Sequence, residues 1–296
     1  MARFYKVYIE LTNICGLKCT FCPPKTKANK TLSLDEFDHI LKEVSPYTKD
    51  IALHVVGDPL VVSNLSEYLD IAKEYKLNVH ITTTGYFLKE EFYSTLIHPA
   101  IKQINFSLNS FNKNNLNTTL EEYLYKIVGF AKYKNLNRRE LFVNFRLWNL
   151  GENKNEYTFN KNVFDVLAKS FDFNLDNCNY KDPFRLENKV LIHFDEYFEW
   201  PSMESKNDTD GFCHGLASQL AILAEGTVVP CCLDLDGNVD LGNIHQTSLA
   251  HILDSRKAKG IVDGFKNHTA KEELCKKCTY KHRFDEKREK QKKLQA

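Results

Sequence analysis

Strand patterns alternate with helix patterns over residues 1–196, and this alternation constrains the fold more than any other feature. Six stretches are rich in β-branched and aromatic residues, which favour strands. Strands that alternate with helices predict parallel βαβ units and an α/β fold. The predicted strands are 4–12, 50–56, 78–83, 101–108, 141–148 and 189–195, and the predicted helices are 33–44, 63–75, 88–97, 119–134 and 159–170.

Three cysteines, Cys15, Cys19 and Cys22, follow directly after the first predicted strand in a C-x3-C-x2-C pattern. Three thiolates this close together can hold one inorganic centre from a single loop. A [4Fe-4S] cluster held by protein alone uses four thiolates, so three leave one iron with an open position for chemistry. A structural zinc site is the alternative, but it needs a fourth Cys or His and favours paired C-x2-C units. A disulfide framework is disfavoured because the chain is long and lacks a secretory signal.

The bulk composition narrows the class of protein. The 296 residues are 43% hydrophobic and 27% charged, which is ordinary for a soluble globular protein. The net charge of +1 gives no global field that would favour nucleic acid. No stretch approaches the roughly 20 apolar residues that span a bilayer, so we expect no membrane insertion. The nine cysteines, mostly in close pairs or triples, indicate metal in a reducing compartment. We therefore expect a cytoplasmic protein.

The sequence pattern changes after residue 212, where short predicted strands, glycine turns and cysteines replace the helical periodicity. A hairpin is predicted around Glu225 and Gly226. Four cysteines in this region are sufficient to ligate one further iron–sulfur cluster, or a zinc ion in a zinc ribbon. They are Cys213, Cys231, Cys275 and Cys278, with Cys231 preferred over its neighbour Cys232.

These two cysteine sets resemble those of the radical S-adenosylmethionine (SAM) enzymes. The run from Gly226 to Cys232, followed by Leu241-Gly-Asn-Ile, is similar to the twitch domain, a shortened form of the SPASM domain. The cysteine spacing is most similar to that of the 2-deoxy-scyllo-inosamine dehydrogenases. The resemblance implies a partial (β/α)6 TIM-like barrel with a small C-terminal iron–sulfur domain. It also implies two [4Fe-4S] clusters and SAM, which one-electron reduction cleaves to a 5′-deoxyadenosyl radical that abstracts hydrogen from a substrate.

The same resemblance gives expected domain boundaries. They are a radical SAM partial barrel over 1–196, a linker over 197–212, a twitch domain over 213–282 and a charged tail over 283–296.

Further site residues are implied by their positions after the predicted strands. Gly57, Asp58 and Pro59 stand where the family carries Gly-Gly-Glu or Gly-Glu-Pro, which helps to bind the SAM amino group; the alternative is a plain turn. The family places a Ser and an Arg where this chain has Ser107 and Arg146, and Thr84 follows the third strand. These residues would contact SAM or the substrate. An Arg within an apolar strand is costly to bury, and its alternative is a structural carboxylate partner.

An auxiliary cluster with four cysteine ligands has no open iron, so we expect it to accept an electron from an oxidised substrate. Peptide-modifying relatives often carry an extra N-terminal domain, and this sequence starts at its first predicted strand, so we expect a small-molecule substrate. We expect a flavodoxin or ferredoxin as the reductant. A peptide substrate stays open, and so does RNA, because 281–293 holds seven Lys or Arg against three acids. A non-catalytic iron–sulfur or zinc protein is the alternative from another class, and it would not cleave SAM.

Overall fold

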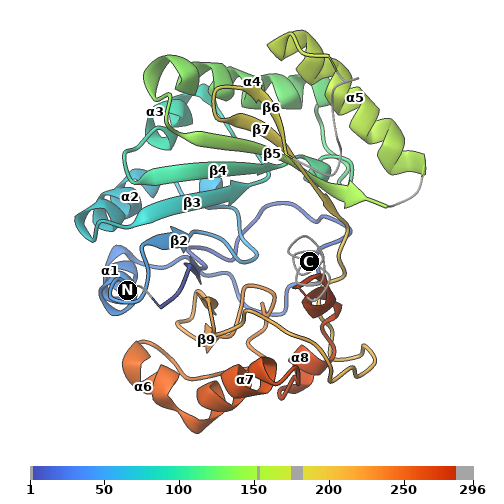
Figure 1. Cartoon of the computed structure of the whole chain (residues 1–296). Helices are drawn as coiled ribbons and strands as arrows, with labels where there is room; N and C mark the ends of the chain where they lie inside the picture. The colour runs from blue at the N-terminus through green and yellow to red at the C-terminus, as the bar shows by residue number, and fades with distance from the viewer. Residues whose placement is uncertain (1–2, 152–153, 175–182, 285–296) are drawn as a thin grey trace, which may run out of the picture. The chain divides into compact units, whose positions relative to one another are not determined.

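The computed structural model describes residues 3–151, 154–174 and 183–284 of the chain, and these residues form two compact units. The first unit combines 1–14, 23–57 and 198–296, and the second combines 15–22 with 58–197. Figure 1 shows the elements of both units. No helix in the described part of the chain is long and apolar enough to cross a membrane.

The first unit contains four strands in the order β2-β1-β8-β9. Strand β1 pairs in parallel with both β2 and β8, and β8 pairs with β9 in an antiparallel hairpin. Gly226 in the hairpin turn has φ +87°, a left-handed conformation that glycine adopts at no steric cost. The hairpin expected around Gly226 is therefore confirmed. The bounds are Lys6–Ile9 for β1, Asp50–Ala52 for β2, Gln219–Ile222 for β8 and Val228–Val229 for β9.

Three helices of the first unit begin at side-chain caps, which are Ser33, Ser248 and Ser255. Ser33 and Glu36 form the predicted capping box of α1, which buries an apolar face against the unit. Helix α7, which the sequence reasoning did not identify, begins after Ser255. It was missed because Gly260 and Gly264 interrupt its pattern and lower its helix propensity. The bounds are Leu34–Val44 for α1, Leu249–Asp254 for α6, Arg256–Lys266 for α7 and Glu273–Lys276 for α8.

The second unit contains five strands in the order β6-β7-β5-β4-β3. Strands β3, β4, β5 and β7 are parallel, as the alternating sequence pattern predicts, whereas β6 is antiparallel to β7. Strand β6 was not predicted because only Asn188 and Lys189 separate it from β7, so the hairpin lacks the usual glycine signal. The bounds are Asn78–Thr83 for β3, Ile101–Ser107 for β4, Phe142–Leu150 for β5, Phe184–Glu187 for β6 and Val190–Glu196 for β7.

Aromatic packing holds the helices of the second unit against its sheet. Phe130 of α4 contacts Phe106 of β4 and Tyr93 of α3, with ring centroids 6.0 and 5.5 Å apart. The helix predicted over 88–97 is wrong in extent, since only Tyr93–Leu96 is α-helical, and Pro99 follows closely. The remaining bounds are Leu65–Glu74 for α2, Tyr93–Leu96 for α3, Leu120–Asn137 for α4 and Lys154–Phe171 for α5, with 3-10 turns η1, η2 and η3 at Pro59–Val61, Glu90–Phe92 and Leu108–Ser110.

The segment predicted as a linker contains neither helix nor strand, and its one bridge joins Asp210 to Thr269. Most of the predicted charged tail, 285–296, lies outside the described residues.

Candidate functional site

In the second unit, the loop that carries Cys15, Cys19 and Cys22 is held by the segment that follows β4. The backbone N–H of Thr20 donates to the carbonyl of Lys113 over 3.2 Å. The side chain of Asn114 accepts from the N–H of Lys18 over 2.9 Å and donates to Cys19 Sγ over 3.0 Å. A cavity of about 700 Å³ lies beside these contacts, lined by loop residues, Tyr86 and 112–117.

Sequence reasoning did not identify Asn114 or its neighbour Ser110. Both lie in the segment after β4, at the carboxyl end of a parallel strand, where functional residues of (β/α) barrels gather. Position was therefore the only signal available, because the contact between Asn114 and Cys19 joins residues 95 positions apart.

The three thiols of the loop influence one another. Hydrogen bonds from Cys22, Asn114 and Ser110 lower the pKa of Cys19 to about 7, against the effect of burial. The hydrogen bond between Cys22 and Cys19 raises the pKa of the Cys22 thiol. Burial, followed by the negative charge of Asp58, raises the pKa of Cys15 to about 11.

This donor set fits an iron–sulfur cluster. Thiol ligands must lose their protons to bind metal, and neighbouring negative groups oppose that loss here until a cationic centre compensates them. Among the residues that the structure describes, no group of three or more His, Cys, Asp or Glu side chains is arranged to hold a single metal ion. The fit to a cluster is carried by the chemistry of three sulfur donors on one loop.

Asp58 is buried in the second unit, just before η1, and contacts the end of β3. One carboxylate oxygen accepts from the N–H of Leu60 over 3.0 Å. The other accepts from the hydroxyl of Thr83 and from both the N–H and the hydroxyl of Thr84, over 2.8 to 2.9 Å. Burial raises the pKa of Asp58 and these four hydrogen bonds oppose the rise. Asp58 thus positions the start of η1, where Pro59 lies, and the end of β3. Its expected role at the SAM amino group stays a prediction.

The other expected binding residues lie on neighbouring strands or directly after them. Ser107 of β4 is paired in register with Arg146 of β5, so the structure brings these two predicted residues side by side. The guanidinium of Arg146 lies 4.5 Å from the ring centroid of Trp148, a cation–π contact. The carbonyl of Thr84 accepts a hydrogen bond of 2.5 Å from the hydroxyl of Tyr123.

Gly57 lies in the first unit and permits a close backbone approach. A Cβ atom placed on Gly57 would lie 1.9 Å from the carbonyl oxygen of Thr12 and 3.0 Å from the N of Ile14. This glycine is therefore required by the path of the chain immediately before Cys15.

The four cysteines predicted to bind a second cluster interact within the first unit. Burial raises the pKa of each thiol, and the negative charges of neighbouring cysteines raise it further for Cys213, Cys231 and Cys275. The buried side chain of Lys281 donates to the carbonyl of Cys278 over 3.0 Å, and its positive charge opposes the rise at Cys213 and Cys278. These four thiols are therefore close enough to influence one another's pKa values.

The side chain of Cys232 has different surroundings from that of Cys231. It makes a hydrogen bond with Tyr8 and packs against an apolar cluster that includes Ala221 and Val229. Burial raises the pKa of Cys232 to about 12. The charge of Cys213 raises the pKa of both thiols, and that of Cys275 raises the pKa of Cys231.

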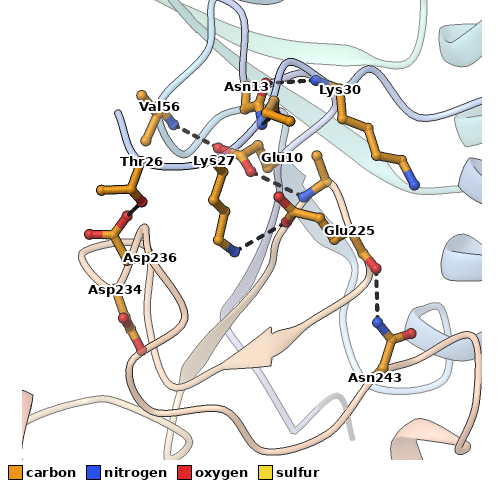
Figure 2. A network of polar contacts seen from close by, with 12 residues as sticks. Glu10, Asn13, Thr26, Lys27, Lys30, Val56, Glu225, Asp234, Asp236 and Asn243 are labelled. Carbon is orange, nitrogen blue, oxygen red and sulfur yellow. Dashed lines mark hydrogen bonds and ion pairs between the residues drawn. The ribbon is translucent and has the colours of Figure 1, made fainter. Parts of the chain in front are cut away.

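A polar network in the first unit joins the chain that follows the cysteine loop to the β8–β9 hairpin (Figure 2). Lys27 forms an ion pair of 3.2 Å with Glu225 of the hairpin. The buried carboxylate of Glu10 accepts from the N–H groups of Val56 and Ala224 over 3.3 and 3.1 Å. Burial raises the pKa of Glu10 to about 7.

Comparison with known proteins agrees with this geometry. Residues 9–145 match the radical SAM superfamily, and residues 213–279 match SPASM, an iron–sulfur cluster-binding domain. The chain therefore belongs to the radical SAM superfamily and is an enzyme of that class with a SPASM domain. The resemblance expected from the two cysteine sets is confirmed, as is the α/β fold class with a partial TIM-like barrel and a C-terminal iron–sulfur domain.

Individual relatives are distant. The chain is 21% identical over 261 residues to GTP 3′,8-cyclase of Campylobacter jejuni, which covers 75% of this chain and 78% of that protein. It is 30% identical over 105 residues to a Methanocaldococcus jannaschii protein named as a glycyl-radical enzyme activating enzyme, which covers 35% of this chain and 40% of the relative.

Two solved structures share the fold over nearly the whole chain. One is BtrN in complex with AdoMet and 2-DOIA, with a TM-score of 0.60, 17% identity and coverage of 94% of both chains. The other is Streptococcus suis SuiB bound to precursor peptide SuiA, with a TM-score of 0.61, 15% identity and coverage of 93% of this chain and 71% of SuiB.

Proposed function

We propose that this enzyme reductively cleaves SAM and oxidises a small molecule by hydrogen abstraction. The observation that carries the proposal is the grouping of Cys15, Cys19 and Cys22 on one loop, held from the carboxyl end of β4. Three thiolates leave one iron of a [4Fe-4S] cluster open. Bound there, the cluster and SAM supply reductive cleavage to a 5′-deoxyadenosyl radical. We expect a flavodoxin or ferredoxin to deliver the electron.

The protein groups around the loop would orient SAM. Asp58 holds the start of η1 and the end of β3 in place, and the oxygen that accepts from Leu60 can accept a further hydrogen bond. Ser107 and Arg146 present a hydroxyl and a guanidinium from adjacent strands, which suits a carboxylate or ribose hydroxyl.

A second cluster on Cys213, Cys231, Cys275 and Cys278 would supply an electron acceptor, since four cysteine ligands leave no open iron. The proposed net reaction is the oxidation of an alcohol to a carbonyl compound. The substrate would lose one hydrogen atom from carbon to the 5′-deoxyadenosyl radical, which would become 5′-deoxyadenosine, and would then lose one proton to a base or solvent and one electron to the second cluster. The likeness in cysteine spacing to the 2-deoxy-scyllo-inosamine dehydrogenases and the fold shared with BtrN, solved with AdoMet and 2-DOIA, support this choice.

A peptide substrate is the second candidate. The fold shared with SuiB, solved with its precursor peptide, favours it. The two candidates differ in the substrate class that stimulates SAM cleavage.

The test supplies the reduced, cluster-loaded enzyme with SAM and either a small-metabolite fraction or a peptide fraction, and measures 5′-deoxyadenosine. We expect the metabolite fraction to stimulate its formation and to yield a product two hydrogen atoms lighter than its substrate. Stimulation by the peptide fraction alone would replace the small-molecule assignment with the peptide one.

A further inference from the structure

The side chain of Asn114 uses every hydrogen-bonding group of its carboxamide within the second unit. The oxygen accepts from the backbone N–H of Lys18 over 2.9 Å. The two protons of Nδ2 are directed to the carbonyl of Ser110, over 2.8 Å, and to Cys19 Sγ, over 3.0 Å. A single residue therefore connects the segment after β4 both to the backbone of the cysteine loop and to one of its sulfur atoms.

The orientation of this carboxamide follows from its backbone partners. A backbone carbonyl can only accept a hydrogen bond, and a backbone N–H can only donate one. Exchanging the oxygen and nitrogen of Asn114 would place two acceptors together at Ser110 and two donors together at Lys18. The nitrogen must therefore face Ser110 and Cys19, so the contact with sulfur is an N–H···S hydrogen bond.

The segment that carries Asn114 is itself anchored. The buried carboxylate of Glu156, on α5, accepts from Asn112 Nδ2 over 3.0 and 3.2 Å and forms an ion pair with Lys113. Asn149 Nδ2 also donates to Glu156 over 2.9 Å. A donor fixed in this way stays directed at the sulfur when the charge of a bound group changes, which is the property that tunes a redox centre.

We propose that Asn114 is a positioning residue of the iron–sulfur site, which clamps the cysteine loop through Lys18 and raises the reduction potential of the cluster through its hydrogen bond to Cys19. The inference rests on the proposed function, because it takes Cys19 as a cluster ligand. A hydrogen bond to a ligating sulfur stabilises the more negative, reduced cluster, so its removal lowers the potential.

Two substitutions separate the hydrogen bond from added charge. Asn114→Asp retains an acceptor for Lys18 and removes both N–H donors. Asn115→Asp adds the same charge on the next residue, which is exposed and lines the same cavity. Asn114→Leu removes the donors without adding charge. The potential is measured by anaerobic titration of the cluster signal that disappears in the Cys15/Cys19/Cys22 triple Ala variant.

We expect the cluster of Asn114→Asp to titrate at a more negative potential than that of Asn115→Asp. We likewise expect the cluster of Asn114→Leu to titrate at a more negative potential than that of the native enzyme. A tenfold smaller equilibrium constant for reduction corresponds to a shift of about 59 mV for one electron. Equal potentials in the Asn114→Asp and Asn115→Asp variants would overturn the tuning role. So would failure of both Asn114 variants to assemble the cluster while Asn115→Asp assembles it, since Asn114 would then be a structural clamp only. If the triple Ala variant retains every cluster signal of the native enzyme, the ligand assignment in the proposed function fails instead.

Discussion

Replacing Gly57 by Ala should destabilise the first unit strongly. The added Cβ would lie 1.9 Å from the carbonyl oxygen of Thr12, whereas real Cβ atoms essentially never approach another atom within 3.0 Å. One backbone segment must therefore move by about 1 Å. The segment around Thr12 is held by its side-chain contacts with Thr31 and with the carbonyl of Lys30, over 2.8 and 3.2 Å. Movement of that size strains or breaks these contacts.

The expected loss combines two effects. Overpacking costs about 1–3 kcal/mol, and each lost hydrogen bond costs about 0.5–1.5 kcal/mol, so the Gly57→Ala variant should lose about 3–5 kcal/mol of unfolding free energy. This corresponds to a decrease in Tm of about 10 °C for a chain of this size.

The assay is thermal unfolding of the iron-free protein, compared with Gly260→Ala as a matched control. A Cβ at Gly260 meets no atom within 4 Å, and this residue lies inside α7. Alanine there should stabilise the helix by up to about 1 kcal/mol. A Gly57→Ala variant that melts within about 2 °C of the native chain would refute the steric reasoning, given that 1 kcal/mol alone moves Tm by that much.

Three further outcomes follow from the contacts described. Burial raises the pKa of Glu10 from 4.5 to about 7, so the contribution of this side chain to stability is complete below pH 4.5 and is lost as pH rises through 7. Relative to the native chain, Glu10→Gln should therefore gain about 3 kcal/mol of unfolding free energy between pH 4.5 and about pH 8, as measured by urea titrations. A difference that does not change with pH would contradict this. Cys231→Ala should abolish iron binding at the C-terminal site and Cys232→Ala should retain it, because Cys232 is engaged by Tyr8 and an apolar cluster whereas Cys231 interacts with Cys213 and Cys275. Iron analysis with the reverse result would make Cys232 the ligand. Asp58→Asn would place an amide nitrogen against the N–H of either Leu60 or Thr84, whichever way the carboxamide turns, and should cost about 2–4 kcal/mol in unfolding free energy. An unchanged urea midpoint would show that these bonds contribute nothing.

Local patterns predicted most of the secondary structure. The capping box at Ser33 and Glu36 depends on residues three positions apart, so it was visible in the sequence and starts α1 in the structure. All six predicted strands are present in the described residues, although β1 and β2 are shorter than expected. Helix α7 was missed because two glycines obscure its periodicity, and packing against the unit overrides their low propensity.

The candidate site was predictable only where its residues are close in sequence. Cys15, Cys19 and Cys22 form a local motif, and the spacing of the other cysteines matches a known domain. Asn114 is distant in sequence from Cys19 and belongs to no motif, so only the fold shows their contact. The different surroundings of Cys231 and Cys232 likewise depend on tertiary packing, because the two residues are adjacent in the sequence.

The most direct test of the central claim is the formation of 5′-deoxyadenosine from SAM by the anaerobically reconstituted, reduced protein. The account predicts cleavage by the native enzyme and its loss when Cys15, Cys19 and Cys22 are replaced by Ala, with about four of about eight irons per chain retained at the C-terminal site. No cleavage by native protein that carries its clusters, or cleavage that survives in the triple variant, would contradict the assignment of this loop as the site of SAM cleavage.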